Sequence, residues 1–467
     1  MTKNLSGRIL PHRKTKEIMF KLKIKKSIIR TVVTLGVYGV FASHALAAPN
    51  VVIIIADDQT WSDAGCYGSE IVKTPNIDRL ASAGLRFDRA FTATAMCAPT
   101  RQQLYTGIFP VKSGAFPNHS KVKVGTKSLV HYYREAGYSV GLCGKRHFGP
   151  PQSFPFEMVP SGKLEAFVRQ KDPFFLVYAS NSPHLPWEDG DTSVYDPKTF
   201  DVPPYIHDNK ETRLALQKYY AEITDFDREL GELDQLIADA GKTDDTIFIY
   251  TSEQGAQFPF GKWTCYEVGL HVGLVVRWPG RIKAGSSSDA MVQYVDVLPT
   301  LLELCGLKVP KDLDGKSFAG VMEGRIDHHN NYVFGVHTTR GIILGSQSYP
   351  VRSVRDTRFK LIKNLNHESE FSNVLIKGDG SSYWASWIRD AATDINAQRL
   401  VNRYINRPAI ELYDLSQDPY ELNNLAGLPE YRNVSRRLDS QLTKWMQKQG
   451  DLGHKTEMTV KPHPTMQ

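Results

Sequence analysis

The run Asn50-Val51-Val52-Ile53-Ile54-Ile55-Ala56 is almost wholly apolar and is followed directly by Asp57 and Asp58. A continuous run of apolar, mostly β-branched residues is typical of a strand that is buried on both faces of a parallel sheet. Ligand sites in parallel α/β sheets lie beyond the carboxyl ends of the strands. Two adjacent carboxylates at that place therefore predict a metal site, with a turn or capping role as the alternative.

The same pattern continues along the chain to about residue 325. Further buried strands are predicted over 138–142, 174–179, 246–251 and 272–278. Helices are predicted over 74–84, 97–105, 127–136, 211–240 and 297–305. Strands that alternate with helices, with polar residues at the strand ends, predict a doubly wound α/β domain.

The pattern changes after about residue 325. Short strands joined by turns are predicted over 332–338, 349–354 and 359–365, and a final helix over 429–448. This predicts a small antiparallel sheet with one helix. We therefore expect an α/β domain over 48–325 and a C-terminal subdomain over 326–467.

Residues 1–47 have the features of a secretory signal peptide. A basic region precedes an apolar core from Ile28 to Phe41, which only Arg30 interrupts, and the segment ends in Ala45-Leu46-Ala47. A membrane anchor is the alternative, but the uninterrupted apolar run is short for a span. We expect a periplasmic or secreted protein without a stable membrane anchor.

The charge of the chain is concentrated in this leader. The formal net charge is +7, whereas residues 1–47 hold ten Lys or Arg and one acid, a net +9, so the remainder carries −2. No general basic field therefore indicates a nucleic-acid partner. The five cysteines include no CxxC pair, which argues against a zinc site.

The segment Cys97-Ala98-Pro99-Thr100-Arg101 is expected at the start of a helix. Pro99 suits a first helical turn, and good helix formers continue to Tyr105. A helix N-terminus favours negative charge on the group that Cys97 carries. A buried free thiol is the alternative.

This Cys-x-Pro-x-Arg order resembles the signature of the type I sulfatases, as do Thr74-Pro75-Asn76-Ile77-Asp78-Arg79-Leu80-Ala81 and Gly144-Lys145-Arg146-His147. The resemblance covers essentially all of the chain after the leader. It implies an alkaline-phosphatase-like α/β fold, with a mixed, mostly parallel sheet flanked by helices and a smaller C-terminal α+β subdomain with an antiparallel sheet. It also implies that a maturation enzyme oxidises Cys97 to Cα-formylglycine (3-oxoalanine). Four cysteines then remain, enough for at most two disulfides.

The resemblance implies one bound Ca²⁺, or Mg²⁺. The family's ligands match Asp57, Asp58, the modified Cys97, Glu253 and Gln254. Glu253 and Gln254 depart from the family pattern, in which Asp is followed by Asn or His, so each side chain is one methylene longer than in the Asp-Asn form. Oxygen ligands suit these hard cations.

The resemblance also implies how the reaction proceeds. A hydroxyl of the hydrated aldehyde at Cys97 attacks sulfur and displaces the alcohol, after which loss of a proton from the second hydroxyl releases sulfate. The residues that match the family's catalytic positions are Cys97, Arg101, Lys145, His147, His184 and Lys262. Arg101 and Lys145 would hold the modified residue, and Lys262 would bind a sulfate oxygen. His147 would take the hydroxyl proton, and His184 would act as general acid.

The segments Gly144–Pro150, Tyr349–Arg355, Glu411–Leu415, Asp418–Glu421 and Asn424–Ala426 look similar to the branch that contains heparan N-sulfatase and bacterial polysaccharide sulfatases. Candidate sugar contacts are His337, Arg340, Trp384 and Trp387, with core packing as the alternative for the tryptophans. We therefore expect an exported sulfatase that acts on a sulfated polysaccharide or its oligosaccharides, of the carrageenan, ulvan or glycosaminoglycan type. The alternatives are an N-sulfate hydrolase, a phosphonate or phosphate ester hydrolase, and a non-catalytic sugar-binding protein.

Overall fold

Strand β1 (Asn50–Ala56) lies in the interior of the largest sheet. The computed structural model describes residues 48–377 and 382–460, so the signal peptide predicted for residues 1–47 lies outside the described residues. β1 is buried along its whole length and pairs in parallel with β6 (Phe174–Ala179) and β7 (Thr246–Ser252). The prediction of a strand that is buried on both faces is confirmed.

The described residues form an eight-stranded sheet in the order β10-β2-β9-β7-β1-β6-β4-β5. Neighbouring strands are parallel except at β9, which pairs antiparallel with both β2 and β7. The sheet is therefore mixed and mostly parallel, as the resemblance implies. Its other strands are β2 (Leu85–Phe87), β4 (Ser139–Gly144), β5 (Glu157–Met158), β9 (Leu274–Arg277) and β10 (Ser286–Ser288).

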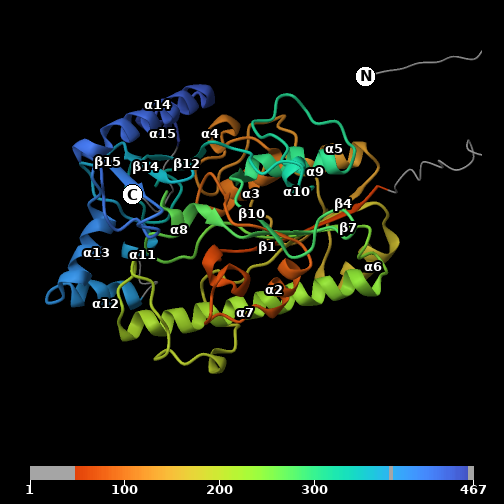
Figure 1. The fold of residues 1–467 in the computed structure, drawn as a ribbon, viewed down its shortest axis with the longest axis horizontal. Coiled ribbons are helices and arrows are strands. Elements are labelled where there is room, and N and C mark those ends of the chain that lie inside the picture. The colour runs from red at the N-terminus through yellow and green to blue at the C-terminus, as the bar shows by residue number, and fades with distance from the viewer. Residues whose placement is uncertain (1–47, 378–381, 461–467) are drawn as a thin grey trace, which may run out of the picture. The chain divides into compact units, whose positions relative to one another are not determined.

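Helices cover both faces of this sheet (Figure 1). On one face lie α2 (Pro75–Ser82), α6 (Leu164–Gln170) and the long α7 (Lys210–Asp239). On the other face lie α3 (Cys97–Thr106), α5 (Leu129–Glu135), α9 (Val297–Leu304) and α10 (Ala319–Met322). The bounds of α2, α3, α5, α7 and α9 agree with the predicted helices to within a few residues, whereas α6 and α10 were not predicted. Two single-turn helices, α4 (Pro110–Ser113) and α8 (Glu267–Leu270), lie in connections.

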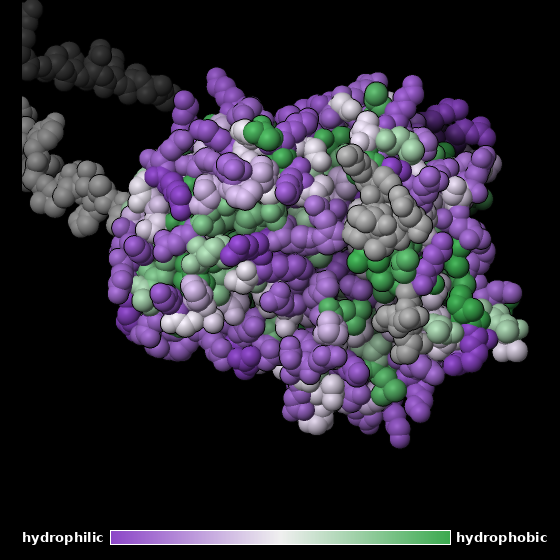
Figure 2. All heavy atoms as spheres, turned by 180° about the vertical axis from the view of Figure 1, so that it is seen from behind, coloured by the Kyte–Doolittle hydropathy of each residue, from purple (hydrophilic) through white to green (hydrophobic). Residues whose placement is uncertain are grey.

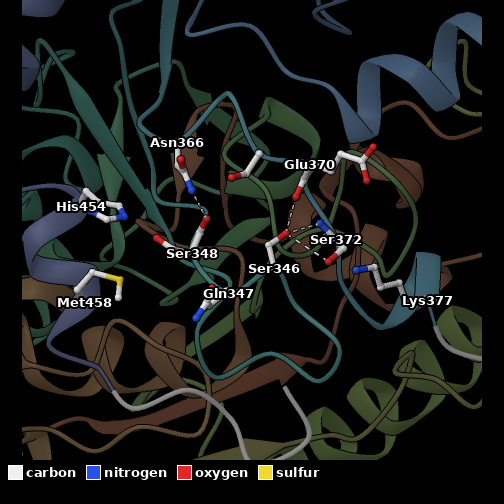
Figure 3. A pocket seen from close by; sticks show the side chains of 10 residues that line it. Ser346, Gln347, Ser348, Asn366, Glu370, Ser372, Lys377, His454 and Met458 are labelled. Atoms are coloured by element: carbon white, nitrogen blue, oxygen red, sulfur yellow. Dashed lines mark hydrogen bonds between the residues drawn. The ribbon is translucent and has the colours of Figure 1, made fainter. Parts of the chain in front are cut away.

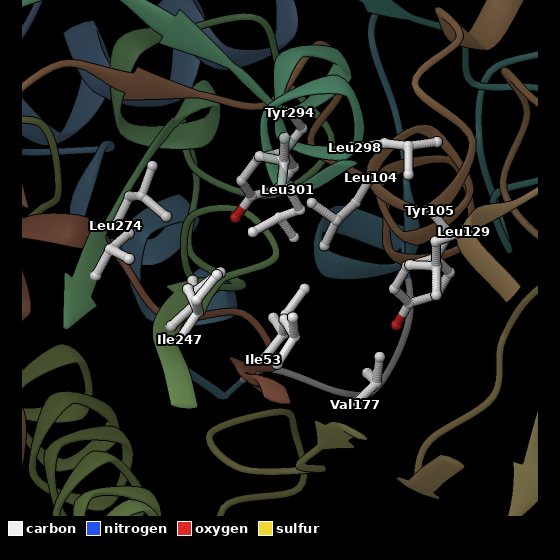
Figure 4. Packing of buried hydrophobic residues seen from close by; sticks show 14 of the residues in the cluster. Ile53, Leu104, Tyr105, Leu129, Val177, Ile247, Leu274, Tyr294, Leu298 and Leu301 are labelled. Carbon is white, nitrogen blue, oxygen red and sulfur yellow. The ribbon is translucent and has the colours of Figure 1, made fainter. Parts of the chain in front are cut away.

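Successive side chains of β1 pack against the helices on opposite faces of the sheet. Val52 and Ile54 belong to the apolar cluster that includes Phe226 of α7. Ile53 points to the opposite face and packs in the cluster that contains Leu104 of α3 (Figure 4). Because successive side chains of a strand point to opposite faces, one apolar strand supports both helical layers.

The C-terminal part contains a four-stranded antiparallel sheet in the order β12-β13-β14-β15. Its strands are β12 (Val333–His337), β13 (Val351–Arg355), β14 (Phe359–Asn364) and β15 (Ile410–Asp414). Its helices are α11 (Val374–Lys377), α12 (Ser382–Asp390), α13 (Ile395–Ile405), α14 (Arg432–Gln449) and α15 (His454–Met458). The expectation of one helix is wrong, and β15 was not predicted. Elsewhere, β3 (Ala90–Phe91), β8 (His271–Val272) and β11 (Val292–Gln293) form a small third sheet.

The described residues form one unit, and a domain boundary near residue 325 stays a prediction. Within the described part of the chain, no helix has the length and apolarity needed to cross a membrane. None of the five cysteines, all of which lie in the described residues, forms a disulfide. Seen from behind, the surface is largely polar, with apolar side chains in separate patches (Figure 2).

Gly144 ends β4 in a conformation that suits only glycine. Its φ is +92°, and a Cβ there would lie 2.1 Å from the carbonyl oxygen of Ala179. We expect Gly144→Ala to lower the free energy of unfolding by about 3 kcal/mol, because backbone strain and a backbone clash combine. Gly137 is the matched control, since its φ is +89° but nothing lies within 4 Å of its Cβ position.

For Gly137→Ala we expect the free energy of unfolding to fall by only about 1 kcal/mol, because the left-handed backbone conformation is the only cost. Urea unfolding followed by circular dichroism measures both values. Equal losses in the two variants would show that the close approach between β4 and β6 is unimportant.

Candidate active site

The candidate site lies at the carboxyl ends of four neighbouring strands, β7, β1, β6 and β4. Asp57 and Asp58 follow β1, and Cys97 is the first residue of α3. The Cys97 Sγ lies 3.8 Å from Asp57 Oδ1 and 4.0 Å from Asp58 Oδ1. All three side chains are buried. The structure thus brings the paired carboxylates to the cysteine at the helix N-terminus.

Four side chains converge closely enough to hold a metal ion. Ligand atoms of Asp57, Asp58, Cys97 and His184 all lie within 4.8 Å of one another. Gln254 adjoins them, with its Nε2 2.5 Å from Asp58 Oδ1, while its buried Oε1 has no hydrogen-bond partner.

Amide oxygen and nitrogen are interchangeable by a half-turn of the side chain. That turn would direct the Gln254 oxygen at the carboxylates, which is the orientation that a cation between them requires. The donor set is rich in oxygen, so these residues fit a hard divalent cation.

Glu253 lies next to this group of side chains, with one carboxylate oxygen 3.2 Å from Gln254 Nε2. Its carboxylate forms a fully buried ion pair with Arg101, whose guanidinium also lies 4.0 Å from Asp57. Burial raises the pKa of Glu253 well above its usual range, although the charge of Arg101 opposes this. Glu253 is not among the converging ligand atoms, so its role as a metal ligand stays a prediction.

Basic side chains surround Cys97. Lys145 forms an ion pair with Asp57, and Lys262, which is 2% exposed, forms one with Asp58. Burial alone would raise the pKa of the Cys97 thiol, but the charges of Lys145 and Lys262 and hydrogen bonds from two histidines hold it well below its usual value. The site therefore favours negative charge at residue 97.

The two predicted catalytic histidines both lie beside Cys97 and supply these hydrogen bonds. His184 Nε2 is 3.6 Å from Asp58 Oδ2. Burial and Lys262 lower the pKa of His184, but Asp58 and Cys97 outweigh them, so the pKa is raised. This favours the protonated form that a general acid needs.

The four predicted sugar contacts are buried. Trp384 and His337 are 4% and 0% exposed, and Trp387 is 0% exposed in the apolar core. Arg340 is 5% exposed, and its guanidinium donates to backbone carbonyls, including that of Gln347. Packing and backbone hydrogen bonds occupy these side chains, which favours core packing for the tryptophans, and a sugar-binding role for the four residues stays a prediction.

A polar cavity of about 460 Å³ lies in the C-terminal part (Figure 3). Hydroxyl groups line much of it, and the Asn366 side chain donates to the Ser348 carbonyl at its edge. None of the predicted site residues lines this cavity. It is therefore separate from the cluster around Cys97.

Sequence reasoning missed polar residues around the cluster. His119 Nδ1 lies 2.8 Å from His147 Nε2, and the Gln257 side chain accepts a hydrogen bond of 3.1 Å from Lys262. Both residues lie in irregular segments. No motif or periodic pattern in the sequence marks them.

Comparison with known families agrees with this geometry. The model of the Sulfatase family matches residues 49–159 and 162–307, more than half of the chain. The chain belongs to the sulfatase family. A second family model, N-sulphoglucosamine sulphohydrolase, C-terminal, matches residues 255–383. This sulfatase is therefore a hydrolase of sulfate esters.

Individual relatives cover most of this sulfatase. It is 37% identical over 424 residues to an ulvan-active sulfatase of Formosa agariphila, covering 86% of this chain and 81% of that protein. It is 28% identical over 461 residues to human N-sulphoglucosamine sulphohydrolase, covering 85% and 89% of the two chains. The fold is shared with a protein whose structure was solved in complex with its substrate, D-glucosamine-2-N,6-O-disulfate. The TM-score is 0.69 at 21% identity, and the match covers 87% of this chain and 99% of that chain.

Proposed function

We propose that this sulfatase removes sulfate groups from a sulfated polysaccharide or its oligosaccharides, of the ulvan, carrageenan or glycosaminoglycan class. The observation that carries the proposal is the buried Cys97 between two carboxylates and a ring of basic side chains. The similarity to an ulvan-active sulfatase over most of both chains supports the substrate class.

The proposed nucleophile is Cys97 after its oxidation to Cα-formylglycine by a maturation enzyme. We assign the cation site to Asp57, Asp58, Gln254 and position 97, with Glu253 as a further candidate. Ca²⁺, or Mg²⁺, would supply positive charge next to the nucleophile. The leader over residues 1–47 is proposed to export the protein.

The basic residues around Cys97 stabilise negative charge or transfer protons during the reaction. Lys145 and Lys262 place fixed positive charges beside Cys97, where they balance the sulfate oxygens. His184 protonates the leaving alcohol oxygen, and His147 takes a proton from the hydroxyl at residue 97. Arg101 holds the site together through its buried contacts with Glu253 and Asp57.

Release of sulfate from a panel of sulfated oligosaccharides tests the substrate class. We expect release from O-sulfated fragments of at least one of the three polysaccharide classes, with one position on the sugar preferred. An N-sulfate hydrolase is the second candidate, because the N-sulphoglucosamine sulphohydrolase family model matches residues 255–383. Release from N-sulfated glucosamine alone would select this second candidate. Faster hydrolysis of aryl phosphates than of aryl sulfates would contradict the proposal.

Addition of Ca²⁺ should stabilise the folded protein. Because the carboxylates of Asp57 and Asp58 converge only in the native state, a Ca²⁺ concentration about 100-fold above Kd should add about 3 kcal/mol to the free energy of unfolding. Thermal unfolding after dialysis against a chelator, with and without added Ca²⁺ or Mg²⁺, measures the shift.

Two variants make this test specific. Asp58→Asn removes one ligand and should abolish most of the Ca²⁺-dependent rise in Tm. Asp63→Asn is the control, because Asp63 hydrogen-bonds Tyr219 at 3.0 Å and lies outside the converging group. An identical Tm with and without the cations in the wild-type protein would refute the assigned cation site.

A further inference from the structure

We propose that His119 is a positioning residue that fixes the ring orientation and the tautomer of His147. The inference rests on the proposed function, in which His147 takes a proton at residue 97. The two imidazoles are in direct contact, with His119 Nδ1 2.8 Å from His147 Nε2 and ring centroids 4.7 Å apart. His119 does not belong to the group of ligand atoms that converge around Cys97, so it acts through His147.

Both histidines have an unusual backbone conformation. The φ angle is 59° at His119 and 37° at His147, a region that non-glycine residues rarely adopt. Such conformations persist only where the surrounding structure enforces them, and they concentrate at functional sites. Two of them, on residues whose rings meet, indicate that the pairing of the rings is built into the fold.

Gln102 of α3 anchors the segments that carry the two histidines. It is fully buried, and both its amide nitrogen and its amide oxygen make two hydrogen bonds. These bonds, 3.0–3.3 Å long, reach backbone groups of Ala98, Ser120, Val122 and Gly149. They tie the chain just after each histidine to the helix that begins at Cys97.

A C-terminal loop holds the same segment from the other side. Gly341 has a φ of +92°, and a Cβ at this position would lie 2.6 Å from the backbone carbonyl oxygen of Asn118. The backbone next to His119 is therefore confined between α3 and the loop at Gly341. This explains how a residue with an exposed side chain keeps one orientation toward His147.

The contact determines which nitrogen of His147 can accept a proton. Since Nε2 faces His119, the other ring nitrogen, the buried Nδ1, is the one left for the Cys97 side. A neutral imidazole carries one hydrogen, so Nδ1 can accept a proton only if Nε2 holds that hydrogen. His119 Nδ1 must then be the acceptor for it.

Asn118 completes this arrangement. If His119 accepts at Nδ1, its own hydrogen lies on Nε2, which is 3.2 Å from the Asn118 side-chain nitrogen. The Asn118 Oδ1 is buried without a partner, and a half-turn of the amide would let it accept the His119 hydrogen. His147 then donates to His119, and His119 donates to Asn118. This direction leaves Nδ1 of His147 free of hydrogen on the side of residue 97.

Isosteric variants of His119 distinguish positioning from packing. In His119→Asn, the amide oxygen takes the place of Nδ1 and can still accept from His147, whereas in His119→Gln the amide reaches the place of Nε2. We expect His119→Ala and His119→Gln to lower kcat by about 10- to 100-fold, with KM changed by less than about twofold, and His119→Asn to keep most of the activity. His328→Ala, at an exposed histidine outside the site, is the control.

The second readout does not depend on turnover. In full-length protein labelled with ¹⁵N-histidine, in which Cys97 has been oxidised to formylglycine and no substrate is present, NMR spectra should show His147 protonated at Nε2. This signature should persist in His119→Asn and be lost in His119→Ala. An unchanged His147 tautomer in His119→Ala, or wild-type kcat in that variant, overturns the inference. If the wild-type protein releases no sulfate from any substrate while the tautomer changes as expected, the proposed function fails and the positioning role stands.

Discussion

Cys97→Ser is expected to abolish turnover while leaving the fold intact. The substitution changes one atom of a side chain that is 2% exposed, so packing at the start of α3 should be preserved. It removes the thiol that the proposed maturation requires, and with it the nucleophile. We expect sulfate release to fall by at least about 10⁴-fold, with an unchanged Tm and circular dichroism spectrum.

Cys66→Ser is the matched control. Burial raises the pKa of the Cys66 thiol to about 12, the opposite direction from the Cys97 thiol, and its backbone amide donates to Asp78. Cys66 therefore lacks the environment that favours negative charge on Cys97, and its replacement should leave kcat unchanged. A Cys97→Ser protein that turns over at a near-normal rate would refute the assigned nucleophile.

The second large effect is expected for Lys262→Ala. Lys262 is buried, contacts Asp58, and is one of the two charges that most stabilise an anion at residue 97. Removal of a preorganised positive group from a site of this kind should lower kcat by about 10²- to 10³-fold. Steady-state sulfate release measures the change.

Lys363→Ala is the control for this substitution. Lys363 also forms an ion pair, with Asp439, but it is partly exposed and belongs to the C-terminal sheet. Its loss should leave the rate unchanged. The Ca²⁺-dependent rise in Tm should survive in Lys262→Ala, and loss of that rise would assign Lys262 to the support of the cation site.

The sequence predicted the central architecture because burial leaves a strong periodic signal. A strand covered on both faces, such as β1, must be apolar throughout, and the polar residues that follow it stand out. The ends of parallel strands meet at one edge, which is why Asp57 and Asp58 could be assigned to a site from their position after β1, while Lys145 and Glu253 were added by the resemblance to the sulfatases.

The parts that sequence reasoning missed or misread depend on contacts between distant segments. Trp384 and Trp387 look alike in the sequence whether they bind a sugar or fill a core, and only packing with α7 and the neighbouring helices shows the second. The buried ion pair between Glu253 and Arg101 was not predicted, and the role of Glu253 as a metal ligand stays a prediction. His119 approaches His147 through a fold that brings together residues 28 positions apart.

The most direct test of the account compares turnover with the chemical state of Cys97 in the same sample. Preparations made with and without a formylglycine-generating enzyme can be assayed for sulfate release, and mass spectrometry of the peptide that contains Cys97 gives the fraction present as aldehyde. The account predicts that kcat per molecule rises in proportion to that fraction and is negligible where the thiol is intact. Full turnover by protein whose Cys97 is an unmodified thiol would contradict it.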